Sequence, residues 1–117
     1  MKNVILSADG ESKIYSVPDE VADKLWEYSM EFCTKWITSS PDAEKYRTGE
    51  HSIYFDETDF IEYLNKFVFP NQKSTFVKNI VWGGEELPEY KDYPYFNFWG
   101  SKYDFICNLL QLYLATL

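Results

Sequence analysis

Residues 18–38 carry the most regular pattern in the chain, and this pattern predicts an amphipathic helix. Pro18 suits the first helical turn, and Asp19 and Glu20 complement the positive end of the helix dipole. Apolar side chains recur at helical spacing on one side, namely Val21, Ala22, Leu25, Trp26, Cys33, Trp36 and Ile37. Because such a stripe has to be covered, other apolar segments of the chain must supply a second packing layer.

Several short β-type runs can form that layer. Residues 2–8 and 12–17 flank the turn-forming Asp9-Gly10 pair and predict a β-hairpin. Further strands are expected over 51–55, 74–82 and 93–99. Helices are expected over 58–69 and 101–117, and one or two additional helical turns after Pro41. The spacing of Asp56 and Asp59 comes close to a capping box at the start of the 58–69 helix. Its expected buried face is Phe60, Ile61, Leu64, Phe67 and Val68.

These elements together predict an α+β fold. We expect residues 1–117 to form a single domain, since no linker or repeat divides them and the length is typical of one domain. The expected architecture is an N-terminal hairpin, a long helix, a mostly antiparallel sheet of four or five strands with helices packed on one face, and a C-terminal helix.

Residues 89–100 contain six aromatic side chains, which raises the question of whether they line a core or form a contact surface. With the two-residue period of a strand, Phe96 and Phe98 fall on one side, and Tyr93 and Tyr95 on the other. Pro94 cannot donate a backbone hydrogen bond, which favours a sheet edge or the start of a strand. We therefore expect the phenylalanines to be buried and the tyrosine side to be available to a partner.

The net charge of −8 limits the classes of ligand. A negative field repels phosphate groups, so we expect neither direct nucleic-acid binding nor binding to an anionic membrane. The same field attracts a basic protein. The apolar run at the N-terminus is too short for a signal peptide, and Cys33 and Cys107 form no CxxC motif, so we expect a reduced, cytoplasmic protein.

Residues that could carry catalysis are few. His51 with Glu50 or Cys33 defines the alternative hypothesis of a small enzyme, although Cys33 falls on the apolar helix stripe. The acids between positions 50 and 62 lack the glycine and the ligand alternation of a calcium loop, and no common nucleotide-binding or hydrolase motif occurs. We therefore expect no enzymatic activity, no cofactor and no metal.

The remaining hypothesis is non-enzymatic binding of a basic protein, as an inhibitor or immunity-type partner of a toxin or nuclease. The chain is similar, in composition alone, to small acidic bacterial proteins that neutralise such partners. Tyrosines and interleaved acids are expected at the contact, because tyrosine supplies interface hot spots and carboxylates steer a basic partner. The predicted contact residues are Glu85, Glu86, Glu89, Tyr90, Asp92, Tyr93 and Tyr95. A structural homodimer joined through residues 101–117 is a second alternative, since that segment is apolar around most of its circumference.

Overall fold

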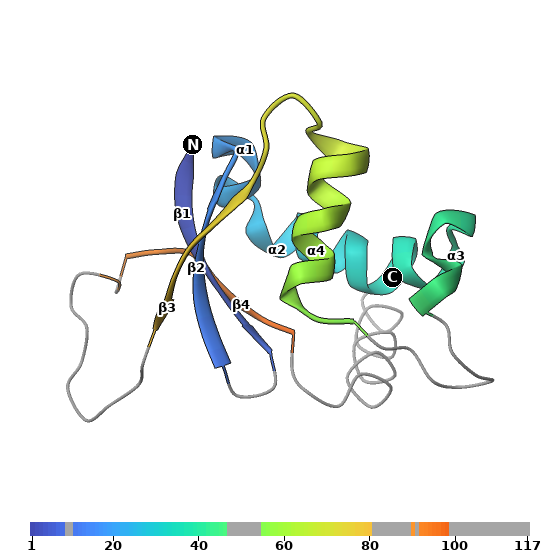
Figure 1. Ribbon diagram of the computed structural model, residues 1–117, viewed down its shortest axis with the longest axis horizontal. Coiled ribbons are helices and arrows are strands. Elements are labelled where there is room, and N and C mark those ends of the chain that lie inside the picture. The colour runs from blue at the N-terminus through green and yellow to red at the C-terminus, as the bar shows by residue number, and fades with distance from the viewer. Residues whose placement is uncertain (9–10, 47–54, 81–89, 91, 99–117) are drawn as a thin grey trace.

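A four-stranded mixed sheet forms one layer of the molecule (Figure 1). The computed structural model describes residues 1–8, 11–46, 55–80, 90 and 92–98. The strands are β1 (Lys2–Ala8), β2 (Glu11–Val17), β3 (Thr75–Ile80) and β4 (Tyr95–Asn97), in the spatial order β3-β2-β1-β4. The predicted hairpin is confirmed as β1 and β2, which pair antiparallel, as do β2 and β3. Strand β4 runs parallel to its neighbour, β1.

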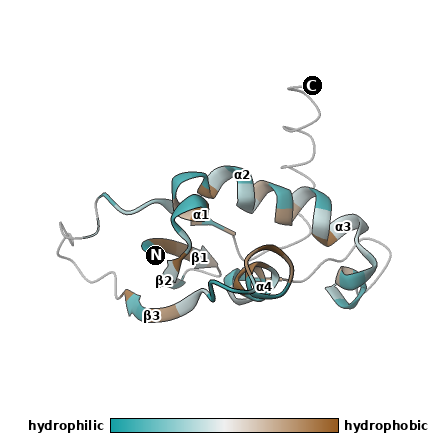
Figure 2. Ribbon diagram, turned by 90° about the horizontal axis from the view of Figure 1, so that it is seen from above, coloured by the Kyte–Doolittle hydropathy of each residue, from teal (hydrophilic) through white to brown (hydrophobic). Residues whose placement is uncertain are grey.

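Helices form the second layer, and Figure 2 shows α1 and α2 running along one side of the strands. The first helical stretch comprises α1 (Asp19–Asp23), α2 (Leu25–Met30), the π-helix η1 (Glu31–Trp36) and α3 (Ile37–Ser39). A 3₁₀ segment, η2 (Pro41–Tyr46), follows as the predicted extra turns. The second stretch comprises α4 (Glu57–Tyr63) and the π-helix η3 (Leu64–Val68). The predicted α+β fold is therefore confirmed.

Strand alternation decides which side chains enter the main core. In β1, Val4, Leu6 and Ala8 point toward the helices, whereas Ile5 points to the opposite face of the sheet. The main core contains these side chains together with buried residues of α1, α2, η1 and α4. A smaller apolar cluster covers the opposite face and consists of Ile5, Ile14, Ile80 and Tyr90.

The predicted long helix is interrupted at Lys24, whose φ of −128° and ψ of 41° are not helical. Beyond this break Leu25, Cys33 and Ile37 are buried as expected. Trp26 was expected on the buried stripe, but it is 60% exposed, so that prediction is wrong. Two ion pairs at i,i+4 spacing lie on the exposed side of this stretch, Glu20–Lys24 and Glu31–Lys35, with N–O distances of 4.0 and 3.5 Å.

The second helical stretch begins with the predicted capping box. The Asp56 carboxylate accepts from the backbone N–H of Thr58 and Asp59, and the Asp59 carboxylate accepts from the backbone N–H of Asp56 at 2.8 Å. The π-helical turn then changes the phase, because its hydrogen bonds span five residues in place of four. As a result Phe67, expected in the core, is 47% exposed.

Some predicted elements lie outside the described residues. These are the Asp9-Gly10 turn, the C-terminal helix over 101–117, and positions 51–54 of the proposed 51–55 strand. Phe55, the last residue of that proposed strand, is described and belongs to no strand. The strands predicted over 74–82 and 93–99 are confirmed as β3 and β4, both at edges of the described sheet.

Candidate partner-binding surface

The segment that contains β4 is held firmly against β1. The backbone N–H of Ile5 donates to the Pro94 carbonyl at 2.8 Å, and that of Phe98 donates to the Ser7 carbonyl at 2.6 Å. The side chains of Phe96 and Phe98 are buried in the main core, with their ring centroids 4.7 Å apart. The burial of Phe96 and Phe98 that the two-residue period predicted is therefore confirmed. Because side chains alternate along a strand, Tyr95 must point to the opposite face of the sheet.

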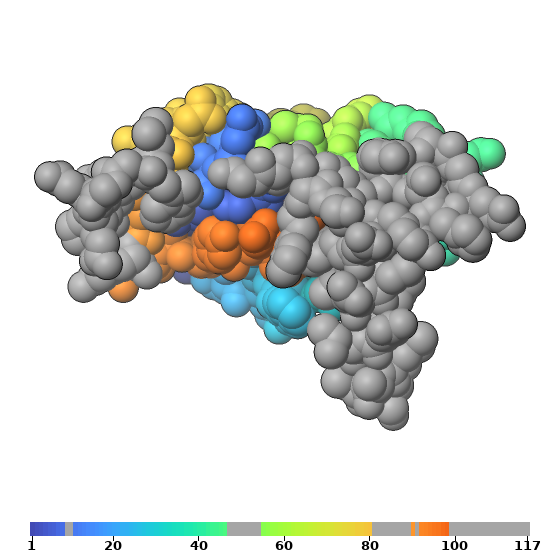
Figure 3. All heavy atoms as spheres, turned by 90° about the horizontal axis from the view of Figure 1, so that it is seen from below, coloured from blue at the N-terminus to red at the C-terminus, as the bar shows by residue number. Residues whose placement is uncertain are grey.

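Tyr95 is the tyrosine that this arrangement leaves exposed. It lies opposite Ile5 in the sheet register, on the face away from the helices, and 53% of its surface is exposed. Asp92 is also exposed, and Tyr93 is half-buried. Figure 3 shows the atoms of residues 92–98 (orange) at the molecular surface, beside light-blue atoms of the helical stretch that includes α2. We call Asp92, Tyr93 and Tyr95 the tyrosine edge.

Tyr90 has a different environment from the rest of the predicted contact set. It is only 8% exposed and packs on Ile5, Ile14 and Ile80, which form the small cluster on the outer face of the sheet. The Lys78 ammonium lies 5.2 Å from the centre of its ring. Most of the Tyr90 ring is therefore used to cover the sheet, which leaves little of it for a partner. Glu85, Glu86 and Glu89 lie outside the described residues.

Trp26 is a surface residue that the sequence pattern did not reveal. Its ring lies 5.7 Å from that of Phe96, on the helix side of β4, whereas Tyr95 lies on the other side of the same strand. Two exposed aromatic residues thus flank one short edge strand. The apolar periodicity of residues 18–38 concealed this, because the break at Lys24 is a backbone feature without a proline or glycine to mark it.

The alternative enzyme site gains no support from the residues that are described. Cys33 is fully buried in the main core, and burial raises the pKa of its thiol well above the ordinary value. A thiol in this state is a poor nucleophile. His51 and Glu50 lie outside the described residues.

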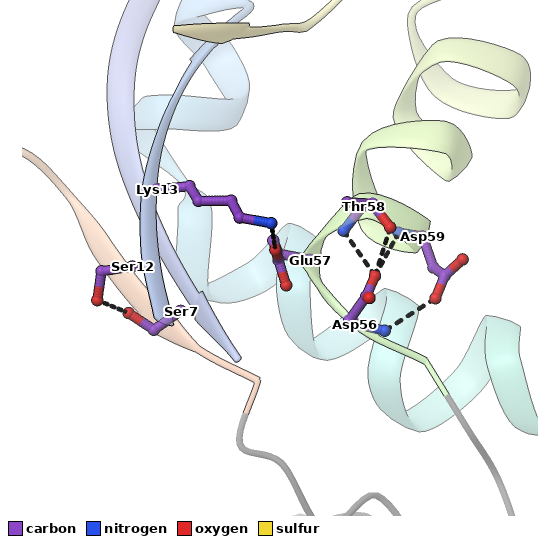
Figure 4. A network of polar contacts seen from close by, with 7 residues as sticks. All are labelled: Ser7, Ser12, Lys13, Asp56, Glu57, Thr58 and Asp59. Atoms are coloured by element: carbon purple, nitrogen blue, oxygen red, sulfur yellow. Dashed lines mark hydrogen bonds and ion pairs between the residues drawn. The ribbon is translucent and has the colours of Figure 1, made fainter. Parts of the chain in front are cut away.

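The acids near the start of α4 serve the fold (Figure 4). Asp56 and Asp59 are used in the capping box, and the Glu57 carboxylate is buried and lies 2.8 Å from the Lys13 ammonium of β2. This hydrogen bond raises the pKa of Lys13. Across the parts of the chain that are described, no three His, Cys, Asp or Glu side chains come together in the way that a metal site requires.

Asp59 provides a pH-dependence that can be tested. Burial, together with the nearby Asp56 charge, raises its pKa to about 6, although the hydrogen bond from the Asp56 backbone opposes the shift. A carboxyl whose pKa is higher in the folded state than in the unfolded chain makes folding less favourable as the pH rises between these two values. We therefore expect this contribution to stability to fall between about pH 4 and pH 6. Because the group is partly solvated, the change should be no more than about 1 kcal/mol.

The Asp59→Asn variant isolates this contribution. The asparagine side-chain oxygen can still accept from the Asp56 backbone N–H, but it does not titrate. We expect the difference in free energy of unfolding between the two proteins, measured by urea denaturation from pH 4 to pH 7.5, to change mainly below pH 6. A difference that stays constant over this range would contradict the raised pKa.

Comparison with family models, with curated proteins and with solved structures found no significant match to this chain. None of the described helices is long and apolar enough to cross a membrane.

Proposed function

We propose that this chain is a non-enzymatic protein that binds a basic protein through the tyrosine edge, as an inhibitor or immunity-type partner of a toxin or nuclease. The observation that carries the proposal is the exposure of Tyr95 on an edge strand whose alternate residues, Phe96 and Phe98, are fixed in the core. A tyrosine held in this way loses little conformational freedom when a partner covers it.

The charge of the chain supports a basic partner. With a net charge of −8, the protein attracts a cationic surface at long range, and the exposed Asp92 carries negative charge beside the two tyrosines. Glu85, Glu86 and Glu89 are proposed to extend the same surface. Binding should therefore weaken as the salt concentration rises, mainly through a slower association rate.

Replacing Tyr95 by alanine should weaken partner binding about tenfold or more, since truncating an aromatic hot spot removes at least 1–2 kcal/mol. Affinity capture with the wild-type chain, the Tyr95→Ala variant and a Phe67→Ala variant as baits tests this directly. Phe67 is a matched control, because it is similarly exposed but belongs to η3. A basic protein retained by the wild type and by Phe67→Ala, but not by Tyr95→Ala, is the expected result.

The affinities of the purified partner for the three chains then give the size of the effect. Equal affinities for the wild type and Tyr95→Ala would refute the proposed contact. A melting temperature of Tyr95→Ala many degrees below that of the wild type would show that the ring is structural.

A further inference from the structure

Trp26 is the most exposed of the large apolar side chains in the described part of the chain, at 60%. It is not a freely moving side chain, since its ring packs on Phe96 with the centroids 5.7 Å apart and the ring planes at 57°. One side of the indole is therefore supported by a core residue of β4, and most of the rest is accessible. Tryptophan in such a position is the residue type most enriched among interface hot spots.

The helical stretch around Trp26 is rich in acidic side chains, most of which are ion-paired. Residues 19–31 include five acids and one lysine, and four of the acids lie near a cation: Asp19 near the N-terminal ammonium, Glu20 near Lys24, Asp23 near Lys2 and Glu31 near Lys35. The fifth, Glu27, is exposed, directly follows Trp26, and has no ion-pair partner within the described residues.

An exposed indole and an exposed, uncompensated carboxylate on consecutive residues of α2 suit a guanidinium group, whose long side chain can reach from one to the other. Arginine is planar and weakly hydrated, so it stacks on an aromatic face more readily than the compact, strongly hydrated lysine ammonium. A second copy of this chain is a poor occupant, because both copies would carry the same net charge of −8 and would offer no excess of cations to Glu27. Nucleic acid is disfavoured by the same charge.

We infer that Trp26 and Glu27 bind an arginine side chain of a basic protein, which extends the partner surface across β4 from the tyrosine edge onto α2. This inference rests on the proposed function, in that the arginine belongs to the partner that covers Tyr95. It adds the chemistry of recognition: an arginine stacks on the indole while the Glu27 carboxylate neutralises its charge.

The test is a titration of the full chain with a nine-arginine peptide and with a matched nine-lysine peptide, followed by NMR of the ¹⁵N-labelled tryptophan indoles. The resonance that disappears in Trp26→Ala identifies the Trp26 indole. We expect this resonance to shift with the arginine peptide, and the arginine peptide to bind several-fold more tightly than the lysine peptide. Trp26→Ala should remove that preference and lower the affinity about tenfold, and Glu27→Gln should lower it about threefold. Phe67→Ala should leave it unchanged.

An unmoved Trp26 indole, or equal affinity of the wild type and Trp26→Ala for the arginine peptide, would overturn the inference. Testing Trp26→Ala and Tyr95→Ala against the captured basic protein separates this inference from the proposed function. Loss of binding with both variants supports both. Loss with Tyr95→Ala alone leaves the tyrosine edge and refutes the Trp26 site, whereas loss with Trp26→Ala alone refutes the tyrosine edge. Unchanged binding with both variants refutes both.

Discussion

Replacing Phe32 by alanine is expected to lower the free energy of unfolding by about 3–5 kcal/mol. Phe32 is fully buried, and five other rings surround it with centroid distances of 5.2–6.2 Å, namely Trp36, Phe55, Phe60, Tyr63 and Phe98. These rings come from both helical stretches, from the residue before the Asp56 cap and from the segment after β4. Truncating Phe32 therefore removes apolar contacts between several elements and leaves a cavity that the rigid neighbouring rings cannot fill.

Urea denaturation followed by circular dichroism measures this effect. Because small domains are stable by only about 5–15 kcal/mol, the variant should unfold at a much lower urea concentration. Phe76→Ala is the matched control, since Phe76 is exposed on β3 and its truncation should change the stability by less than about 1 kcal/mol. If the two variants lost similar stability, Phe32 would not be the centre of the core.

Replacing Lys13 by methionine is expected to lower the free energy of unfolding by about 3 kcal/mol. Glu57 is only 4% exposed, and the Lys13 ammonium lies 2.8 Å from its carboxylate as the ion-pair partner. Without Lys13, a buried negative charge remains uncompensated at the junction of β2 and α4. The expected loss is at the lower end of the range for buried pairs, because Lys13 is itself partly accessible to water.

The Lys66→Met variant provides the comparison, because it breaks an exposed ion pair. Lys66 lies 2.6 Å from Glu62 on the same helical stretch, and such surface pairs contribute less than about 1 kcal/mol. The double variant Lys13→Met/Glu57→Leu should recover most of the loss, since it removes the buried charge as well. Equal losses for Lys13→Met and Lys66→Met would contradict the importance of burial at Glu57.

Features that depend on neighbours in the sequence could be predicted in advance. The capping box needs only Asp56 and Asp59 three residues apart, and the burial of Phe96 and Phe98 follows from strand alternation. The hairpin also formed as predicted, because its two apolar runs are adjacent in the chain.

The candidate site was only partly predictable, because exposure depends on what packs nearby. Tyr90 looked like the other tyrosines of its segment, yet it covers Ile5, Ile14 and Ile80 from three different strands. Trp26 followed the apolar period, but it comes two residues after the non-helical Lys24 and is 60% exposed. No local sequence pattern indicates that Tyr90 is buried or that Trp26 is exposed.

The amino-acid sequence by itself determined the α+β class, the Asp56–Asp59 helix cap, the two-sided character of β4 and the net negative charge, since these follow from composition and from spacings of a few residues. Only the tertiary structure decided that β4 lies parallel to β1, that Lys13 pairs with Glu57, and that Trp26 and Tyr95 flank one strand. These contacts join residues far apart in the chain. Their formation depends on how the sheet and the helical layer pack together. The spacing of apolar residues along one helix or strand does not reveal which residues of the other layer will contact it.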